Sequence, residues 1–584
     1  MKTNQLLIFL FISFSQLCFA QVGINTTTPE GALDVVSSDQ GIVVPRVSDI
    51  NDVTDGQGNP PVDGTVAYDT STNSFCFRAA GQWICTNSAG TTTVVTPPPP
   101  DFDNTTTDTN YFKASNTDAL DQFGYAIDIS LDGNTLAIGA NNEDSNATGV
   151  NGNQADNSLD RVGAVYIFTR SNGVWSQQAY IKPSNSNSFI NFGHSVSLSG
   201  DGNLLAVGAL NENSGSGGIG ANQNDSSKPE SGAAYVFTRS GSSWSQIEYI
   251  KAPFPDQNDN FGQSIALSSD GSTLAVGARR EASNASGING DQTNNSASAS
   301  GAAYVYSITA GVVNFEAYIK ASNSGQFDQF GWSLDLSADG NTLAVGAFSE
   351  ASNATGVNGD QTNNSAFAAG AVYIFVRNAG TWTQEAYIKA SNAEQEDEFG
   401  YRVALASDGN TLAVGAHREE NLSPGINPPE GSSGIGVGAV YIFTRSGSTW
   451  TQEAYIKASN PSTTDLFGES VALTSNGNIL AVGASSEDSN ASGIDGDQND
   501  NSATNAGAVY LFIRENGVWT QDVYLKSTNA MAGSLFGFSA ALSSDGSTIG
   551  VGAPQESSSA VGLNGDQNNT DANSAGAAYV FDAN

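Results

Sequence analysis

The sequence predicts an all-β protein whose main part is a seven-bladed β-propeller, and three observations carry this prediction. A Phe-Gly pair recurs seven times at intervals of 68 or 69 residues, so one structural unit is repeated. Each unit contains four short, alternating apolar and polar stretches bounded by turn residues, which indicates a four-stranded antiparallel meander. In the first stretch, bulky residues alternate with mostly small ones, so both faces of each sheet pack on neighbouring sheets, as in a propeller. The repeated Phe residues are Phe123, Phe192, Phe261, Phe330, Phe399, Phe467 and Phe536.

The composition excludes several classes of function. The 584 residues include 21 Lys and Arg against 59 Asp and Glu, a net charge of -38, which excludes binding to nucleic acid. Only two His are present, which argues against a Ser-His-Asp enzyme or a His-rich zinc site. With 39% hydrophobic residues, the chain has enough apolar area for a large core.

Residues 1–20 have the pattern of a secretory signal peptide. A single Lys precedes an apolar run from Leu6 to Phe14, and Cys18-Phe19-Ala20 forms a small-x-small cleavage pattern before Gln21. A lipoprotein anchor on Cys18 is the alternative, although Gln16 and Leu17 occupy positions that prefer small residues. No later stretch approaches 18 apolar residues, so we expect no transmembrane segment and a secreted or cell-surface protein.

A small β-rich module with a disulfide is expected over residues 21–90. Two strands flank a turn at Ala80-Gly81, and counting outward from this turn places Cys76 opposite Cys85. Directly opposed residues of an antiparallel pair lie close enough for a disulfide, which an oxidising compartment favours. Residues 91–109, with four consecutive prolines at 97–100, are expected to be a semi-rigid linker. The propeller then covers residues 110–584.

The strand count predicts how the propeller ring closes. The seventh copy ends after Tyr579-Val580-Phe581 and has no fourth strand of its own. The same Tyr-x-Lys pattern that ends the other copies occurs at the start of the domain, in Tyr111-Phe112-Lys113. We therefore expect this N-terminal segment to supply the outer strand of the last blade.

Two charged residues recur at fixed positions in every copy of the repeat. A Glu follows each Gly-Ala pair by three residues, and a Lys ends each fourth strand. The glutamates are Glu143, Glu212, Glu281, Glu350, Glu419, Glu487 and Glu556, and the lysines are Lys113, Lys182, Lys251, Lys320, Lys389, Lys457 and Lys526. Both series fall at the same level of the disc. One interpretation is a set of carboxylates displayed for cations or a ligand. The other, which we favour because unpaired acids would add repulsion, is a set of structural ion pairs.

The connections between second and third strands predict which face is functional. They are 22 residues long, for example residues 141–162 and 485–506, and lie on the same side as the connections between blades. The opposite side has only tight turns. Long loops on a rigid scaffold commonly carry binding. In the sixth copy, the ligand-binding candidates are Asp488, Asp495, Asp497 and Asp500, and the last three are weak candidates for a calcium site.

The order Phe-Gly, then Gly-Ala (Gly552-Ala553-Pro554 in the last copy), then Gly-Ala-Val-Tyr-Ile-Phe resembles FG-GAP repeats. These form the propeller of integrin alpha subunits and of bacterial secreted relatives, and the resemblance implies extracellular adhesion or ligand binding. The family's calcium loop is not matched, because Ser130-Leu131-Asp132-Gly133-Asn134 offers one carboxylate in a tight turn. The sequence therefore assigns no cofactor with certainty. Calcium binding in the long loops is the alternative that stays open. The N-terminal module more loosely resembles modules at the front of tail-fibre-like proteins, which would support attachment or display.

These features favour a secreted or surface binding protein for an extracellular protein or carbohydrate, rather than an enzyme. A structural surface protein without a specific ligand is the first alternative. A propeller glycosidase or lyase is the second, because the fifth copy departs from the others with His417-Arg418-Glu419-Glu420. The oligomeric state and the identity of the ligand do not follow from the sequence.

Overall fold

The structure is a computed structural model that describes residues 22–24, 33–35, 45–47, 50, 53, 65–79, 82–87, 92–95, 99–102 and 108–583. The expected signal peptide and its alternative anchor at Cys18 lie outside the described residues. The chain divides into two compact units, Met1–Pro98 and Pro99–Asn584, which are considered separately. Among the described residues, no helix has the length and apolar character needed to cross a membrane.

The described residues of the first unit form two sheets. A parallel pair joins β1 (Val22–Ile24) to β2 (Leu33–Val35), and a five-stranded sheet has the order β3-β4-β5-β6-β7. Its strands are β3 (Arg46–Val47), β4 (Val66–Asp69), β5 (Ser74–Ala79), β6 (Gln82–Asn87) and β7 (Thr92–Val95). Strand β7 lies in the segment for which the sequence predicts a linker. Its Thr and Val residues favour a strand and pair with β6 through Thr86↔Thr92 to Trp83↔Val95, so the sheet extends further than predicted.

The predicted disulfide of this unit is confirmed. In the pairing of β5 with β6, Cys76 lies opposite Cys85 and Ala79 opposite Gln82, the register expected from the turn. The two sulfur atoms are 2.01 Å apart. Both cysteines are buried with Ala67 and Trp83, so the bond lies in the small core of the module.

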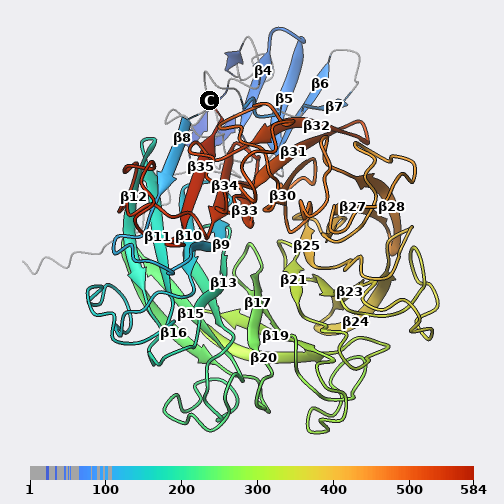
Figure 1. Ribbon diagram of the computed structural model, residues 1–584. Coiled ribbons are helices and arrows are strands. Elements are labelled where there is room, and N and C mark those ends of the chain that lie inside the picture. Colours follow the sequence, from blue (N-terminus) through green and yellow to red (C-terminus); the bar gives the residue numbers. More distant parts are fainter. Residues whose placement is uncertain are drawn as a thin grey trace, which may run out of the picture. The chain divides into compact units, whose positions relative to one another are not determined.

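The second unit is a seven-bladed propeller of four-stranded antiparallel sheets (Figure 1). The first strands are β9 (Phe123–Ile129), β13 (Phe192–Leu198), β17 (Phe261–Leu267), β21 (Ser333–Leu336), β25 (Arg402–Leu405), β29 (Ser470–Leu473) and β33 (Ser539–Leu542). The second strands are β10 (Thr135–Ala140), β14 (Leu204–Ala209), β18 (Thr273–Ala278), β22 (Thr342–Ala347), β26 (Thr411–Ala416), β30 (Ile479–Ala484) and β34 (Thr548–Ala553). The third strands are β11 (Ala164–Ser171), β15 (Ala233–Ser240), β19 (Ala302–Thr309), β23 (Ala371–Asn378), β27 (Ala439–Ser446), β31 (Ala508–Glu515) and β35 (Ala577–Asp582). The fourth strands are β12 (Val174–Ile181), β16 (Ser243–Ile250), β20 (Val312–Ile319), β24 (Thr381–Ile388), β28 (Thr449–Ile456), β32 (Val518–Leu525) and, in blade 7, β8 (Asp108–Phe112).

The ring closes as the strand count predicts. Strand β8 pairs antiparallel with β35, with Tyr111 opposite Tyr579, and Figure 1 shows the blue strand beside the red one. Tyr111 is buried, and its hydroxyl lies 2.6 Å from the Ser558 Oγ. Phe102, in the segment expected to be linker, is also buried, in the core that blades 6 and 7 share. The N-terminal end of the unit is therefore part of blade 7.

The Phe-Gly and Gly-Ala motifs are explained by the contact between neighbouring blades. Gly400 has a φ of +90°, a conformation that side chains rarely adopt. A Cβ on Gly346 of the preceding blade would lie 2.1 Å from the carbonyl oxygen of Gly400. The Ser333 hydroxyl donates to the same oxygen at 2.8 Å. Glycine at both positions therefore lets the inner ends of adjacent blades approach closely.

The same serine bond joins blades at five of the seven interfaces. The five donors are Ser195, Ser264, Ser333, Ser470 and Ser539. Ala126 and Arg402 occupy the position in blades 1 and 5. The small residues of the first strand therefore connect blades as well as filling space between them.

Candidate functional site

The seven glutamates that recur in every copy of the repeat each pair with the lysine at the end of the same blade's fourth strand. The distances from Lys Nζ to Glu Oε2 are 2.5 to 3.0 Å, and every side chain is at most 4% exposed. Burial lowers the pKa of Lys389, and the adjacent Glu350 opposes this shift. The carboxylates are consequently enclosed and neutralised rather than displayed to solvent.

Each pair also anchors the base of a long loop. In blade 4, Glu350 accepts hydrogen bonds from Lys389 at 3.0 Å, Tyr387 at 3.1 Å and Asn323 at 2.9 Å. The carbonyl of Glu350 accepts from Gly370 N at 2.9 Å, where the loop returns to β23. The start and end of the loop are thus held at one buried point, which limits the movement of its base.

The structure does not bring the acidic candidates of the blade 6 loop together. The Oδ1 atom of Asp488 accepts from Asn505 N at 2.8 Å, and that of Asp495 accepts from Tyr524 N at 2.9 Å. Asp497 and Asp500 each accept from the backbone two residues further on, at 3.0 and 3.1 Å. The described residues contain no group of three or more His, Cys, Asp or Glu side chains placed to hold a metal ion. Asp497 and Asp500 thus stabilise local turns, whereas Asp488 joins the two ends of the loop and Asp495 joins the loop to β32.

The distinctive residues of blade 5 are also separated. His417 Nε2 lies 3.0 Å from Glu398 Oε2, whereas Glu419 pairs with Lys457. Beside Glu419 lies a cleft of about 290 Å³ whose lining includes Asp397. Burial, together with Glu419 and other nearby acids, raises the pKa of Asp397 to about 7. The cleft is acidic, but His417 does not line it, so the acid and base that the enzyme alternative requires do not meet there.

A larger cavity of about 530 Å³ follows the axis of the propeller and is lined by the first strands of all seven blades. Its end on the tight-turn side is encircled by backbone hydrogen bonds between successive turns. Leu131 N donates to Gly200 O at 2.9 Å, and the circle closes from Ser544 N to Leu131 O at 2.9 Å. This ring holds the turns of neighbouring blades together around the axis.

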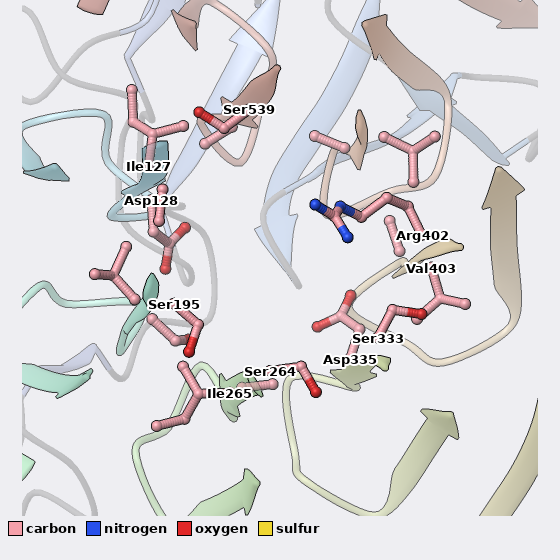
Figure 2. A pocket seen from close by; sticks show the side chains of 18 of the residues that line it. Ile127, Asp128, Ser195, Ser264, Ile265, Ser333, Asp335, Arg402, Val403 and Ser539 are labelled. Atoms are coloured by element: carbon pink, nitrogen blue, oxygen red, sulfur yellow. The ribbon is translucent and has the colours of Figure 1, made fainter. Parts of the chain in front are cut away.

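The opposite end, which we call the mouth, lies on the long-loop face, because the first strands begin there and the second strands end there. One residue from each blade, two positions after the repeated Phe, surrounds it. This mouth ring consists of Tyr125, His194, Gln263, Trp332, Tyr401, Glu469 and Phe538, and all of these except Glu469 line the cavity. Arg279 and Arg402 also line the cavity, and Arg402 points into it in Figure 2. The mouth therefore combines aromatic rings with cationic groups, unlike the acidic surface expected from the composition.

Two carboxylates lie deeper in the cavity. Asp128 and Asp335 point into it from blades 1 and 4 (Figure 2). Each accepts a hydrogen bond from the first strand of the next blade, Asp128 from Leu198 N at 2.6 Å and Asp335 from Leu405 N at 2.7 Å. Burial raises the pKa of Asp128 to about 7 and that of Asp335 to about 6.

These buried acids predict that the protein is more stable at mildly acidic pH. The raised pKa values mean that the folded state binds protons more readily than the unfolded state, whose Asp groups titrate near 3.8. Their stabilising contribution is therefore fully present below the unfolded pKa and is lost as the pH rises through 6 to 7. Melting temperature measured from pH 8 to pH 5 at constant ionic strength should increase as the pH falls.

Asp335→Ser provides the matched variant for this prediction, because Ser197 makes the equivalent bond to Leu267 N at 3.0 Å in blade 2. The variant should fold and show a weaker dependence of melting temperature on pH. A melting temperature that falls toward pH 5, or an unchanged slope in the variant, would contradict the assignment.

The mouth was not identified from the sequence. Its residues are far apart in the chain, and the residue after Phe-Gly differs in type among most copies. One signal was present, because Arg402 replaces a small residue in an otherwise small first-strand position. This departure indicates that the position in blade 5 does not make the serine hydrogen bond that joins neighbouring blades.

Comparison with known proteins supports the repeat assignment. The FG-GAP repeat family model matches residues 175–218, 244–306, 382–443 and 450–512, and a model described as a phage tail like trimerisation region matches residues 23–98. No curated protein matches the chain.

Solved structures match over most of the chain at low identity. The β-propeller domain of Myceliophteria thermophila Cps50 (Swd1) is 10% identical with a TM-score of 0.42, covering 82% of this chain and 100% of that one. A putative 6-phosphogluconolactonase from Bacteroides uniformis is 11% identical with a TM-score of 0.38, covering 77% and 93%. The Pseudomonas aeruginosa periplasmic gluconolactonase PpgL is 13% identical with a TM-score of 0.39, covering 77% and 92%. At these values the lactonase names carry no argument about activity.

Proposed function

This chain is an FG-GAP repeat β-propeller protein, and from that premise we propose that it is exported and binds an extracellular protein or carbohydrate through the long-loop face. The FG-GAP repeat matches favour a surface or binding protein in general. The observation that carries the proposal is the anchoring of the loops. Each long loop begins at a buried Glu–Lys pair, so the face presents seven loops from fixed bases. A preorganised surface loses less conformational entropy on binding than a mobile one.

Export is supported by the signal-peptide pattern of residues 1–20 and by the Cys76–Cys85 disulfide, which persists in an oxidising compartment. A binding role is favoured over catalysis because the structure separates the acid and base candidates of blade 5. A glycan array and a pull-down against cell-surface proteins, each with and without calcium, would identify the ligand. If neither experiment identifies a ligand, the remaining explanation is a structural surface protein without a specific ligand.

Replacing residues 496–502, the outer part of the blade 6 loop, with a short Gly-Ser turn should weaken binding to the partner identified in this way. The exchange keeps Glu487, which pairs with the buried Lys526. The propeller should keep its melting temperature to within a few degrees, because loop length changes cost little entropy. The control is the equivalent exchange of a tight turn on the opposite face, such as residues 516–517 for Gly-Gly. Binding that survives the loss of several long loops in turn would show that another face is functional.

A second proposal concerns assembly. The match of residues 23–98 to a trimerisation region favours a trimer held together by the N-terminal module. Three propellers on one stem would raise avidity for a repetitive surface. Light scattering should give three times the chain mass for residues 21–584 and a monomer for residues 99–584. A monomeric mature chain would exclude the proposal.

A further inference from the structure

Two arginines at the mouth lack an ionic partner among the described residues. Arg279 donates to the Asn260 Oδ1 at 3.3 Å, and Arg402 donates to the carbonyl of Tyr401 at 3.3 Å. Each guanidinium has five donor N–H groups, so most of these remain available. Burial and the neighbouring Arg280 lower the pKa of Arg279 to about 10, but the group stays charged at neutral pH. Two partly buried cations without a carboxylate partner form a ready site for an anion.

The aromatic rings of the mouth ring lie beside these cations. Trp332 contacts Phe348 and Tyr401, with ring centroids 4.5 and 5.4 Å apart. The Arg279 guanidinium lies 4.8 Å from the Trp332 ring, and that of Arg402 lies 4.9 Å from the Tyr401 ring. The planar faces suit the C–H surface of a sugar ring, while the stacked guanidiniums are held in fixed orientations.

Polar atoms at the mouth are also left without partners. Gln263 lines the cavity and is 7% exposed, and its Oε1 atom has no hydrogen-bond partner in the described part of the chain. Trp332 Nε1, in the same lining, likewise has none there. Glu469, the carboxylate of the mouth ring, accepts a hydrogen bond from the Ser485 hydroxyl. A ligand with hydroxyl groups would satisfy such atoms, whereas a simple inorganic anion would not.

We propose that the mouth binds an acidic saccharide unit, a sugar ring with a carboxylate that lies on Arg279 and Arg402 while the ring stacks on the aromatic side chains. This inference rests on the proposed binding function and specifies the chemistry of the ligand. The cavity of about 530 Å³ is within the size range of small-ligand sites and admits a monosaccharide. The net charge of -38 disfavours a long polyanion, so the ligand is a single acidic unit rather than a densely charged chain.

Isothermal titration calorimetry of the mature chain tests the proposal. The probes are glucuronate, galacturonate and N-acetylneuraminate, with glucose and galactose as neutral counterparts and acetate as an acid without a ring. At least one acidic sugar should bind, and its neutral counterpart and acetate should bind about tenfold or more weakly, because a charge-assisted bidentate contact or the stacked ring is lost.

Variants identify the site. Arg402→Ser installs the residue that five other blades carry at this position, and Arg279→Asn matches Asn141 of blade 1, so both should fold. Each should weaken binding of the acidic sugar about tenfold or more. Arg280→Gln removes an adjacent exposed arginine outside the cavity lining and should leave binding unchanged. Melting temperatures verify folding of all three.

Three outcomes with the sugar probes would overturn the proposal: no acidic sugar binds, neutral sugars bind equally well, or the Arg402→Ser and Arg279→Asn proteins bind as tightly as the parent. If those variants also keep binding to the partner found by array or pull-down, the loop face remains functional and only the ligand chemistry is wrong. If acidic sugars bind at the mouth while loop exchange affects no partner, the proposal stands and the proposed loop function fails. Binding of an acidic peptide in preference to every sugar would assign the site to a protein ligand and overturn the saccharide.

Discussion

Replacing Glu350 with Gln should lower the free energy of unfolding by about 3 to 5 kcal/mol, because it leaves a buried charge without its partner. Lys389 lies 3.0 Å from Glu350, and the side chains are 0% and 1% exposed. Urea unfolding followed by intrinsic fluorescence measures the loss. Any change in ligand affinity should be indirect, through a less fixed loop base, because the pair is enclosed beneath the loop and does not contact the ligand.

The matched control is the partly exposed pair of Lys228 and Asp256, whose side chains are 39% and 34% exposed. Asp256→Asn should cost only about 0 to 1 kcal/mol, since water screens this pair. Combining Glu350→Leu with Lys389→Met should recover much of the stability, because no unpaired charge remains. Similar losses for Glu350→Gln and Asp256→Asn would contradict a stabilising role for the buried pairs.

Removing strand β8 should destabilise the propeller by on the order of 10 kcal/mol, because large apolar side chains and one member of a buried ion pair are lost together. Tyr111 and Phe112 are at most 1% exposed, and Lys113 lies 3.0 Å from Glu556. The comparison is between residues 105–584 and 116–584. Both proteins lack Phe102, so the difference between their melting temperatures measures the contribution of strand β8 to stability.

A synthetic peptide of residues 105–115 should raise the melting temperature of the shorter protein, because it can occupy the vacant edge of β35. A peptide in which Tyr111 and Phe112 are replaced by Ser should not. Equal melting of the two proteins would show that the ring does not depend on the shared blade.

The elements that follow from local pattern were predictable. The opposition of Cys76 and Cys85 depends only on counting from a turn, and the closure of blade 7 only on counting strands. The pairing of Glu350 with Lys389 is predictable because both positions follow the repeat at one level of the disc and unpaired acids would add repulsion. The two predictions for the propeller rest on many residues, because the pattern recurs in seven copies.

Features that arise from the assembled ring were not predictable. Arg279 and Arg402 are more than 100 residues apart and converge only because blades 3 and 5 face one axis. In the acidic loop of blade 6, residues close in sequence have separate partners, because Asp495 accepts from strand β32 whereas Asp497 accepts from a turn of the loop itself. Strand β7 was assigned to a linker because the adjacent prolines outweighed the four strand-forming residues before them.

Hydrogen–deuterium exchange of the mature chain with its partner tests the central claim most directly. The long-loop face should become protected on binding, at the seven loops between second and third strands and at the starts of the first strands that surround the mouth. The tight turns at the other end of the channel, for example residues 131–134 and 200–203, should exchange at an unchanged rate. Protection confined to those turns, or to the outer strands alone, would contradict the assignment of the functional face.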